Sequence, residues 1–197
     1  MKQLNNAVFT LISLIIFSFS LSACAIHMTK ETGEELNPAV LNAAFNTQST
    51  NLSSYSKCAS QPTVRIVNAE ENNNDFVIGL IDNMESRPYI IKPKELNDFI
   101  VAYFKDVYSK NMIKTDDNSI KKIEISIVKA QILRTVFGRG ASVTLKVNLP
   151  EIKKDYEFSS ESWTGGANPY RALAYAIHET VWKVINDKSI QDYILCK

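Results

Sequence analysis

The 197-residue sequence has little of the material from which metal and nucleotide sites are built. It contains two histidines, three cysteines and six glycines, too few for zinc sites of the Cys/His type or for glycine-rich phosphate loops. The 22 Lys and Arg residues stand against 21 Asp and Glu residues, a net charge of +1. Because nucleic-acid-binding proteins need a basic surplus to neutralise phosphates, the composition does not support this class. No cofactor is expected.

Recognisable catalytic groups are also missing from the sequence. His178 is followed by Glu179, but the second histidine of an HExxH zinc motif is absent. Two interpretations of His178 stay open: a general base or ligand, or a boundary residue that packs its ring against the core, which we favour. There is no Gly-x-Ser-x-Gly elbow. We therefore predict no catalytic residue, no metal site and no enzymatic activity.

Residues 1–23 read as an export signal. An apolar run from Ala7 to Leu21 follows a single charge, Lys2. Fifteen residues at about 1.5 Å each make a helix of roughly 22 Å, short of the roughly 30 Å hydrocarbon core of a bilayer. A charged start, a short apolar run and small residues after it are typical of a signal peptide.

The signal ends in the sequence Leu21-Ser22-Ala23-Cys24, which resembles the bacterial lipobox. In a lipobox the cysteine is acylated and becomes the first residue of the mature chain, so we predict lipidation of Cys24. An ordinary secretory peptide with a chance cysteine is the alternative. Ala25 follows where inner-membrane lipoproteins of Gram-negative bacteria carry aspartate. By this resemblance, the expected location is the outer membrane, lipid-anchored and facing the periplasm.

Lipidation of Cys24 would leave two cysteines, Cys58 and Cys196. An even pair in an oxidising compartment indicates a disulfide. Cys58 precedes the first expected strand and Cys196 is next to the last residue, so the bond would tie both ends of the folded part together. Two free thiols, or a bridge between two molecules, are the alternatives.

The mature chain divides into a tether and one domain. Residues 24–61 are rich in Asn, Ser, Thr and Ala without a sustained period, which predicts a lipidated N-terminus and a flexible tether. Residues 62–197 predict a single domain of order ββαβββα with a last helical turn. The fold class is α+β: a two-layer structure with a mainly antiparallel sheet of about five strands and two amphipathic helices on one face. The expected strands and helices are 63–67, 76–81, a helix from 93 to about 111, 123–132, 141–149, 156–163 and a helix from 169 to 185.

A long hairpin from about Ile123 to Leu149 is the most specific structural prediction. Its apolar residues change from odd to even positions near Val128, which indicates a β-bulge. The turn is predicted at residues 137–140, and the hairpin is expected to project beyond the helices. Phe137 and Arg139 at the tip are candidate partner contacts; the alternative is a solvated turn with Phe137 folded back on the core.

The helix ends carry their own signals. Pro93 suits a first helical position, and Asn168-Pro169 reads as an N-cap followed by proline. Ser189 with Asp192 three residues later resembles a capping box for a last short helix.

The closing segment allows a comparison with a known family. The runs 172–177, 180–181 and 186–194, together with the lipobox and the ββαβββα order, resemble the YajG-like bacterial outer-membrane lipoproteins. The resemblance implies a periplasmic domain on the outer membrane, a fold related to auxiliary lipoproteins of envelope transport systems, and no enzymatic residues. The sequence departs from the family pattern in its longer tether, at Lys110-Asn111, and in Cys58 and Cys196.

These features predict a non-catalytic binding or assembly module of the cell envelope. Its partners would be the outer membrane, through the lipid, and an unknown envelope protein or polymer. A hydrolase of envelope polymers is one alternative and requires an acid pair or a nucleophile–base pair in a cleft. A carrier of lipid or lipopolysaccharide is the other and requires an apolar cavity.

Overall fold

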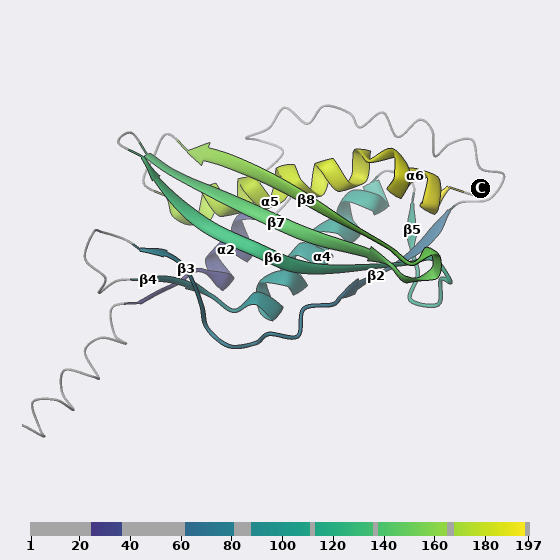
Figure 1. The fold of residues 1–197 in the computed structure, drawn as a ribbon, viewed down its shortest axis with the longest axis horizontal. Helices are drawn as coiled ribbons and strands as arrows, with labels where there is room; N and C mark the ends of the chain where they lie inside the picture. Colours follow the sequence, from purple (N-terminus) through teal and green to yellow (C-terminus); the bar gives the residue numbers. More distant parts are fainter. Residues whose placement is uncertain are drawn as a thin grey trace, which may run out of the picture.

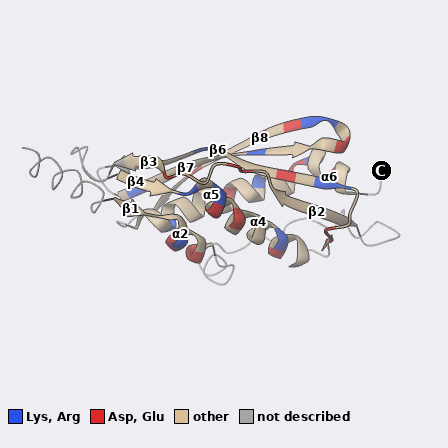
Figure 2. Ribbon diagram, turned by 90° about the horizontal axis from the view of Figure 1, so that it is seen from below, with Lys and Arg blue, Asp and Glu red and all other residues tan. Residues whose placement is uncertain are grey.

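The computed structural model describes residues 25–36, 62–80, 88–110, 113–135, 138–164 and 168–195. They form an α+β fold in which helices cover one face of a long sheet (Figures 1 and 2). This confirms the predicted fold class. The elements, in chain order, are β1 (Ile26–His27), α2 (Thr29–Glu35), β2 (Thr63–Asn68), β3 (Phe76–Leu80), β4 (Pro88–Ile91), α4 (Pro93–Lys110), β5 (Lys114–Thr115), β6 (Lys122–Thr135), β7 (Gly138–Leu149), η2 (Pro150–Ile152), β8 (Lys154–Thr164), α5 (Pro169–Asn186) and α6 (Lys188–Ile194).

The larger sheet has five strands in the order β5-β2-β6-β7-β8. The three long strands β6, β7 and β8 pair antiparallel, whereas β2 runs parallel to both β5 and β6. The sheet is therefore mixed, although its longest pairings are antiparallel as predicted.

A second, three-stranded sheet of order β1-β4-β3 was not expected from the sequence. The predicted strand at Phe76 belongs to this sheet and pairs antiparallel with β4. Gly79 of β3 packs against Ile132 of β6, where an added Cβ would lie 3.1 Å from the Ile132 Cβ. This close approach joins the small sheet to the far half of the hairpin.

The hairpin of β6 and β7 is confirmed, including its bulge. The pairing register shifts between Ile127 and Lys129, which leaves Val128 as the extra residue, half exposed. The predicted turn is wrong for its last three residues, because β7 already begins at Gly138. Phe137 lies outside the described residues. Beyond β7, the hairpin continues into β8 as a three-stranded antiparallel unit.

The two long helices begin where the sequence predicted. Pro93 opens α4, and the Asn168 side chain accepts a hydrogen bond from the Arg171 backbone N–H (3.0 Å) before Pro169 opens α5. The inward faces of both helices are apolar, and they pack on the inward residues of β6 and β7, such as Ile125 and Leu145. The buried positions of α5 include Leu173, Ile177, Val181, Val184 and Ile185.

The cap of α6 differs from the prediction. Asp187 is the N-cap, and its carboxylate accepts hydrogen bonds from the backbone N–H groups of Ser189 (2.8 Å) and Ile190 (3.1 Å). Ser189 is therefore the second residue of the helix instead of its cap. Asp and Ser are equally good N-caps, so the sequence offered two neighbouring candidates for one position.

The expected tether is wrong for its first part. Residues 26–36 form β1 and α2 and belong to the folded domain: Met28 is fully buried and Leu36 is 3% exposed. The Phe99 ring of α4 packs directly on Gly33, where a Cβ would lie 2.5 Å from the ring. A helix of seven residues is too short to show a period, and contacts of this kind stabilise it. Residues 37–61 lie outside the described residues.

Candidate functional site

Residues 26–36, which were predicted to belong to the tether, form one wall of the candidate site. Their backbone is tied to β4: the Met28 N–H donates to the Ile90 carbonyl (2.9 Å), and the Lys92 N–H donates to the Thr29 hydroxyl (2.8 Å). These bonds fix where α2 begins, although no side chain caps it. The outward side of the helix then presents a row of glutamates.

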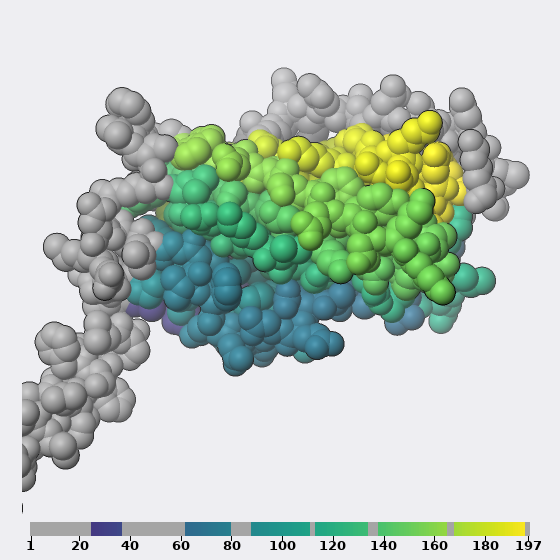
Figure 3. All heavy atoms as spheres, in the orientation of Figure 1, coloured from purple at the N-terminus to yellow at the C-terminus, as the bar shows by residue number. Residues whose placement is uncertain are grey.

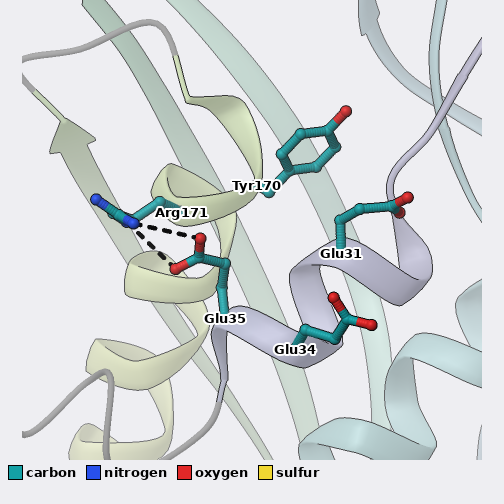
Figure 4. A pocket seen from close by; sticks show the side chains of 5 residues that line it. All are labelled: Glu31, Glu34, Glu35, Tyr170 and Arg171. Carbon is teal, nitrogen blue, oxygen red and sulfur yellow. Dashed lines mark hydrogen bonds and ion pairs between the residues drawn. The ribbon is translucent and has the colours of Figure 1, made fainter.

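An open cleft of about 340 Å³ separates α2 from the start of α5. Three glutamates of α2, Glu31, Glu34 and Glu35, line one wall, and Tyr170 and Arg171 of α5 line the other (Figure 4). The wall residues of α2 and α5 are more than 130 positions apart in the sequence, so the fold alone brings them together.

Arg171 neutralises only one of the three carboxylates. Its Nε and Nη2 donate to the two oxygens of Glu35 at 3.2 and 3.4 Å, the forked geometry typical of arginine–carboxylate pairs. Burial, then the nearby Glu31 and Tyr89, raises the pKa of the Tyr170 phenol. The cleft is therefore negative where α2 faces it, and the Arg171–Glu35 pair joins its two walls.

The two other glutamates remain available to a partner. Glu31 is exposed, and Glu34 makes only a long, solvent-exposed ion pair with Lys30 (3.8 Å, 65% and 81% exposed). Exposed pairs of this kind contribute little energy and are readily exchanged. Chemically, this wall is suited to receiving a basic group, whereas a general acid needs a carboxyl shielded from water.

A second depression, of about 400 Å³, lies on the other side of α2, against α4. Glu34 borders both depressions, and Phe99, Tyr103 and Asp106 are among the residues on the α4 side. Asp106 is held by Lys110 at 2.8 Å. Charged residues of both signs follow the outward sides of α2 and α4 in Figure 2, so α2 stands as a polar ridge between two hollows.

His178 belongs to the interior of the domain. It is 4% exposed, and its Nδ1 accepts hydrogen bonds from the Tyr103 hydroxyl (2.5 Å) and the Trp182 indole N–H (3.2 Å). Burial lowers the pKa of His178 to about 4, so the ring is neutral near pH 7 with its proton on Nε2. Burial likewise raises the pKa of Tyr103. The packing interpretation of His178 fits these contacts, with the ring deeper than a boundary residue.

Most of the site residues predicted from sequence lie outside the described residues: Cys24, Cys58, Cys196 and Phe137. Arg139 is described: it is the half-buried second residue of β7, beside the turn, and it pairs with Arg134 of β6 and Thr164 of β8. Its role as a partner contact stays a prediction. Within the described residues, no three His, Cys, Asp or Glu side chains gather in a way that would hold a metal ion.

Comparison of the chain with models of protein families, with curated proteins and with solved structures finds no match. In the described part of the chain, no helix is both long enough and apolar enough to cross a bilayer.

Proposed function

We propose that this chain is a lipoprotein of the outer membrane, anchored through Cys24 and related to the YajG-like family, and that it acts as a non-catalytic binding or assembly module. The acidic cleft between α2 and α5 would receive basic groups of an envelope partner. The observation that carries this proposal is the wall of three glutamates, of which Arg171 pairs only Glu35.

The geometry of the cleft favours binding over hydrolysis or lipid transport. Glu31 and Glu34 are exposed on an open surface, where they lack the shielding that tunes a catalytic acid. A lipid carrier needs an apolar, enclosed site, whereas carboxylates line both depressions beside α2. The described core, for its part, is filled by interlocking apolar side chains of the sheet and helices.

The proposal is tested by cross-linking in cells with a photoreactive residue in place of Tyr170. We expect adducts that disappear when Glu34 is changed to Lys, because the reversed charge repels a basic partner. The matched control is E157K, an equally drastic change on the exposed face of β8, which should leave the adducts intact. The binding role of the cleft is contradicted if the adducts are absent or if both charge reversals reduce them equally.

A further inference from the structure

The first strand of the domain begins almost at the predicted lipid. Only Ala25 separates Cys24 from Ile26, the first residue of β1. Two residues of fully extended chain span at most about 7 Å. If Cys24 is acylated as proposed, the start of β1 cannot move away from the bilayer, and the domain would rest against it.

The end of the molecule that holds β1 also holds the ends of other strands. β1 begins beside Tyr89 of β4, and β6, β7 and β8 reach the same end, opposite α6 (Figures 1 and 2). The pairing of Arg139 with Thr164, the last residue of β8, lies at this end. The fold therefore sets which surface would meet the lipid.

This end carries an exposed tryptophan on the open face of the sheet. Gly140 of β7 pairs with Trp163 of β8 on one side and with Leu133 of β6 on the other. The Trp163 ring lies across Gly140, so close that a Cβ at that position would collide with it. The ring occupies the space that a side chain at position 140 would fill, and it is still 50% exposed. Figure 3 shows the same face of the long strands from outside.

We propose that Trp163 rests in the interfacial layer of the outer membrane and, with the anchor at Cys24, fixes the orientation of the domain. Tryptophan favours this layer, because its ring is apolar and its N–H is polar. The inference rests on the proposed lipid anchor. Two attachment points at this end would turn it towards the membrane and leave α6, at the opposite end of the sheet, furthest from the lipid.

The other tryptophan of the chain provides an internal control. Trp182 lies 13 residues after Pro169, about 20 Å along α5 at 1.5 Å per residue. It is partly buried against the core, and its indole N–H donates to His178 of the same helix (3.2 Å). A probe in the acyl chains would therefore reach Trp163 and not Trp182.

The test uses the full lipidated chain purified from bacterial membranes and reconstituted in phosphatidylethanolamine and phosphatidylglycerol vesicles, with or without bromine on the acyl chains. The variant W182F reports Trp163 alone, and W163F reports Trp182 alone. We expect the brominated lipid to quench the emission of Trp163 and to leave that of Trp182 unchanged.

Vesicle flotation separates the two ways in which this could fail. Protein that floats with the vesicles but shows no quenching of Trp163 overturns the orientation while leaving the anchor intact. Protein that does not float overturns the anchor, and the orientation with it. Quenching of Trp163 by soluble amino-sugar oligomers in place of brominated lipid would show a glycan site and also overturn the inference.

Discussion

Buried His178 makes the stability of the domain fall in acid. Its pKa is lowered to about 4 by burial, whereas an unfolded histidine titrates near 6.5. The unfolded chain therefore takes up the proton first, so the stabilising effect of the neutral ring is complete above pH 6.5. It is lost as the pH falls from about 6.5 towards 4.

The size of this effect follows from the two pKa values. Between pH 7.5 and pH 5 the difference in proton binding amounts to about 2 kcal/mol of unfolding free energy. The comparison variant is H178Q, whose amide oxygen can accept from the Tyr103 hydroxyl and the Trp182 N–H but does not titrate. Carboxylates elsewhere also respond to pH, and the difference between the two proteins removes their contribution.

The assay is urea unfolding of wild type and H178Q at pH 7.5 and pH 5. We expect the wild type to lose about 2 kcal/mol more than H178Q, which is a difference of about 1 M in the urea midpoints at ordinary slopes. Equal losses in both proteins would refute the reasoning, because His178 would then be protonated in the folded state as easily as in the unfolded chain.

Three further predictions concern the ends of the domain. Met28→Ala should lower the free energy of unfolding in urea by about 2–5 kcal/mol, as for a buried core methionine. An unchanged free energy would show that residues 25–36 belong to the tether and not to the folded domain. Gly33→Val should push the Phe99 ring away and release α2, seen as faster proteolysis within residues 25–36, whereas an unchanged cleavage rate would show that the helix adapts. Cys58 and Cys196 should appear as one linked peptide in non-reducing maps of protein from the periplasm, and labelling of Cys58 by a thiol reagent before reduction would exclude the bond.

Local signals in the sequence located the main elements well. Proline at the first position set the starts of α4 and α5, and the change of parity placed the bulge at Val128. These features are visible because each depends on residues close together in the chain. The apolar face of a helix of 18 residues repeats often enough to stand out.

The elements that were missed depend on distant contacts. In α2 only Thr29 and Thr32 are buried within the helix, and Met28 and Leu36 hold it at either end, so its seven residues resemble a polar loop. The strand β4 is four residues long and nearly all buried, a pattern that fits a strand or a helix equally well. The small sheet was missed because two of its three strands, β1 and β4, are too short to be recognised in the sequence.

The acidic cleft was hidden for the same reason. Glu31, Glu34 and Glu35 read as charges of a solvated tether, and nothing in the sequence near Arg171 indicates that it would face them. The spacing of the glutamates at i, i+3 and i+4 is the one available signal, because it places them on one side of any helix that forms there.

The lipid anchor at Cys24 underlies both the proposed location and the proposed orientation of the domain. Mass spectrometry of the mature protein, taken from bacterial membranes, should show a first residue Cys24 that carries acyl chains, with residues 1–23 absent. A mature chain that retains residues 1–23, or that begins with an unmodified residue, would contradict the lipid anchor and the membrane-bound orientation built on it.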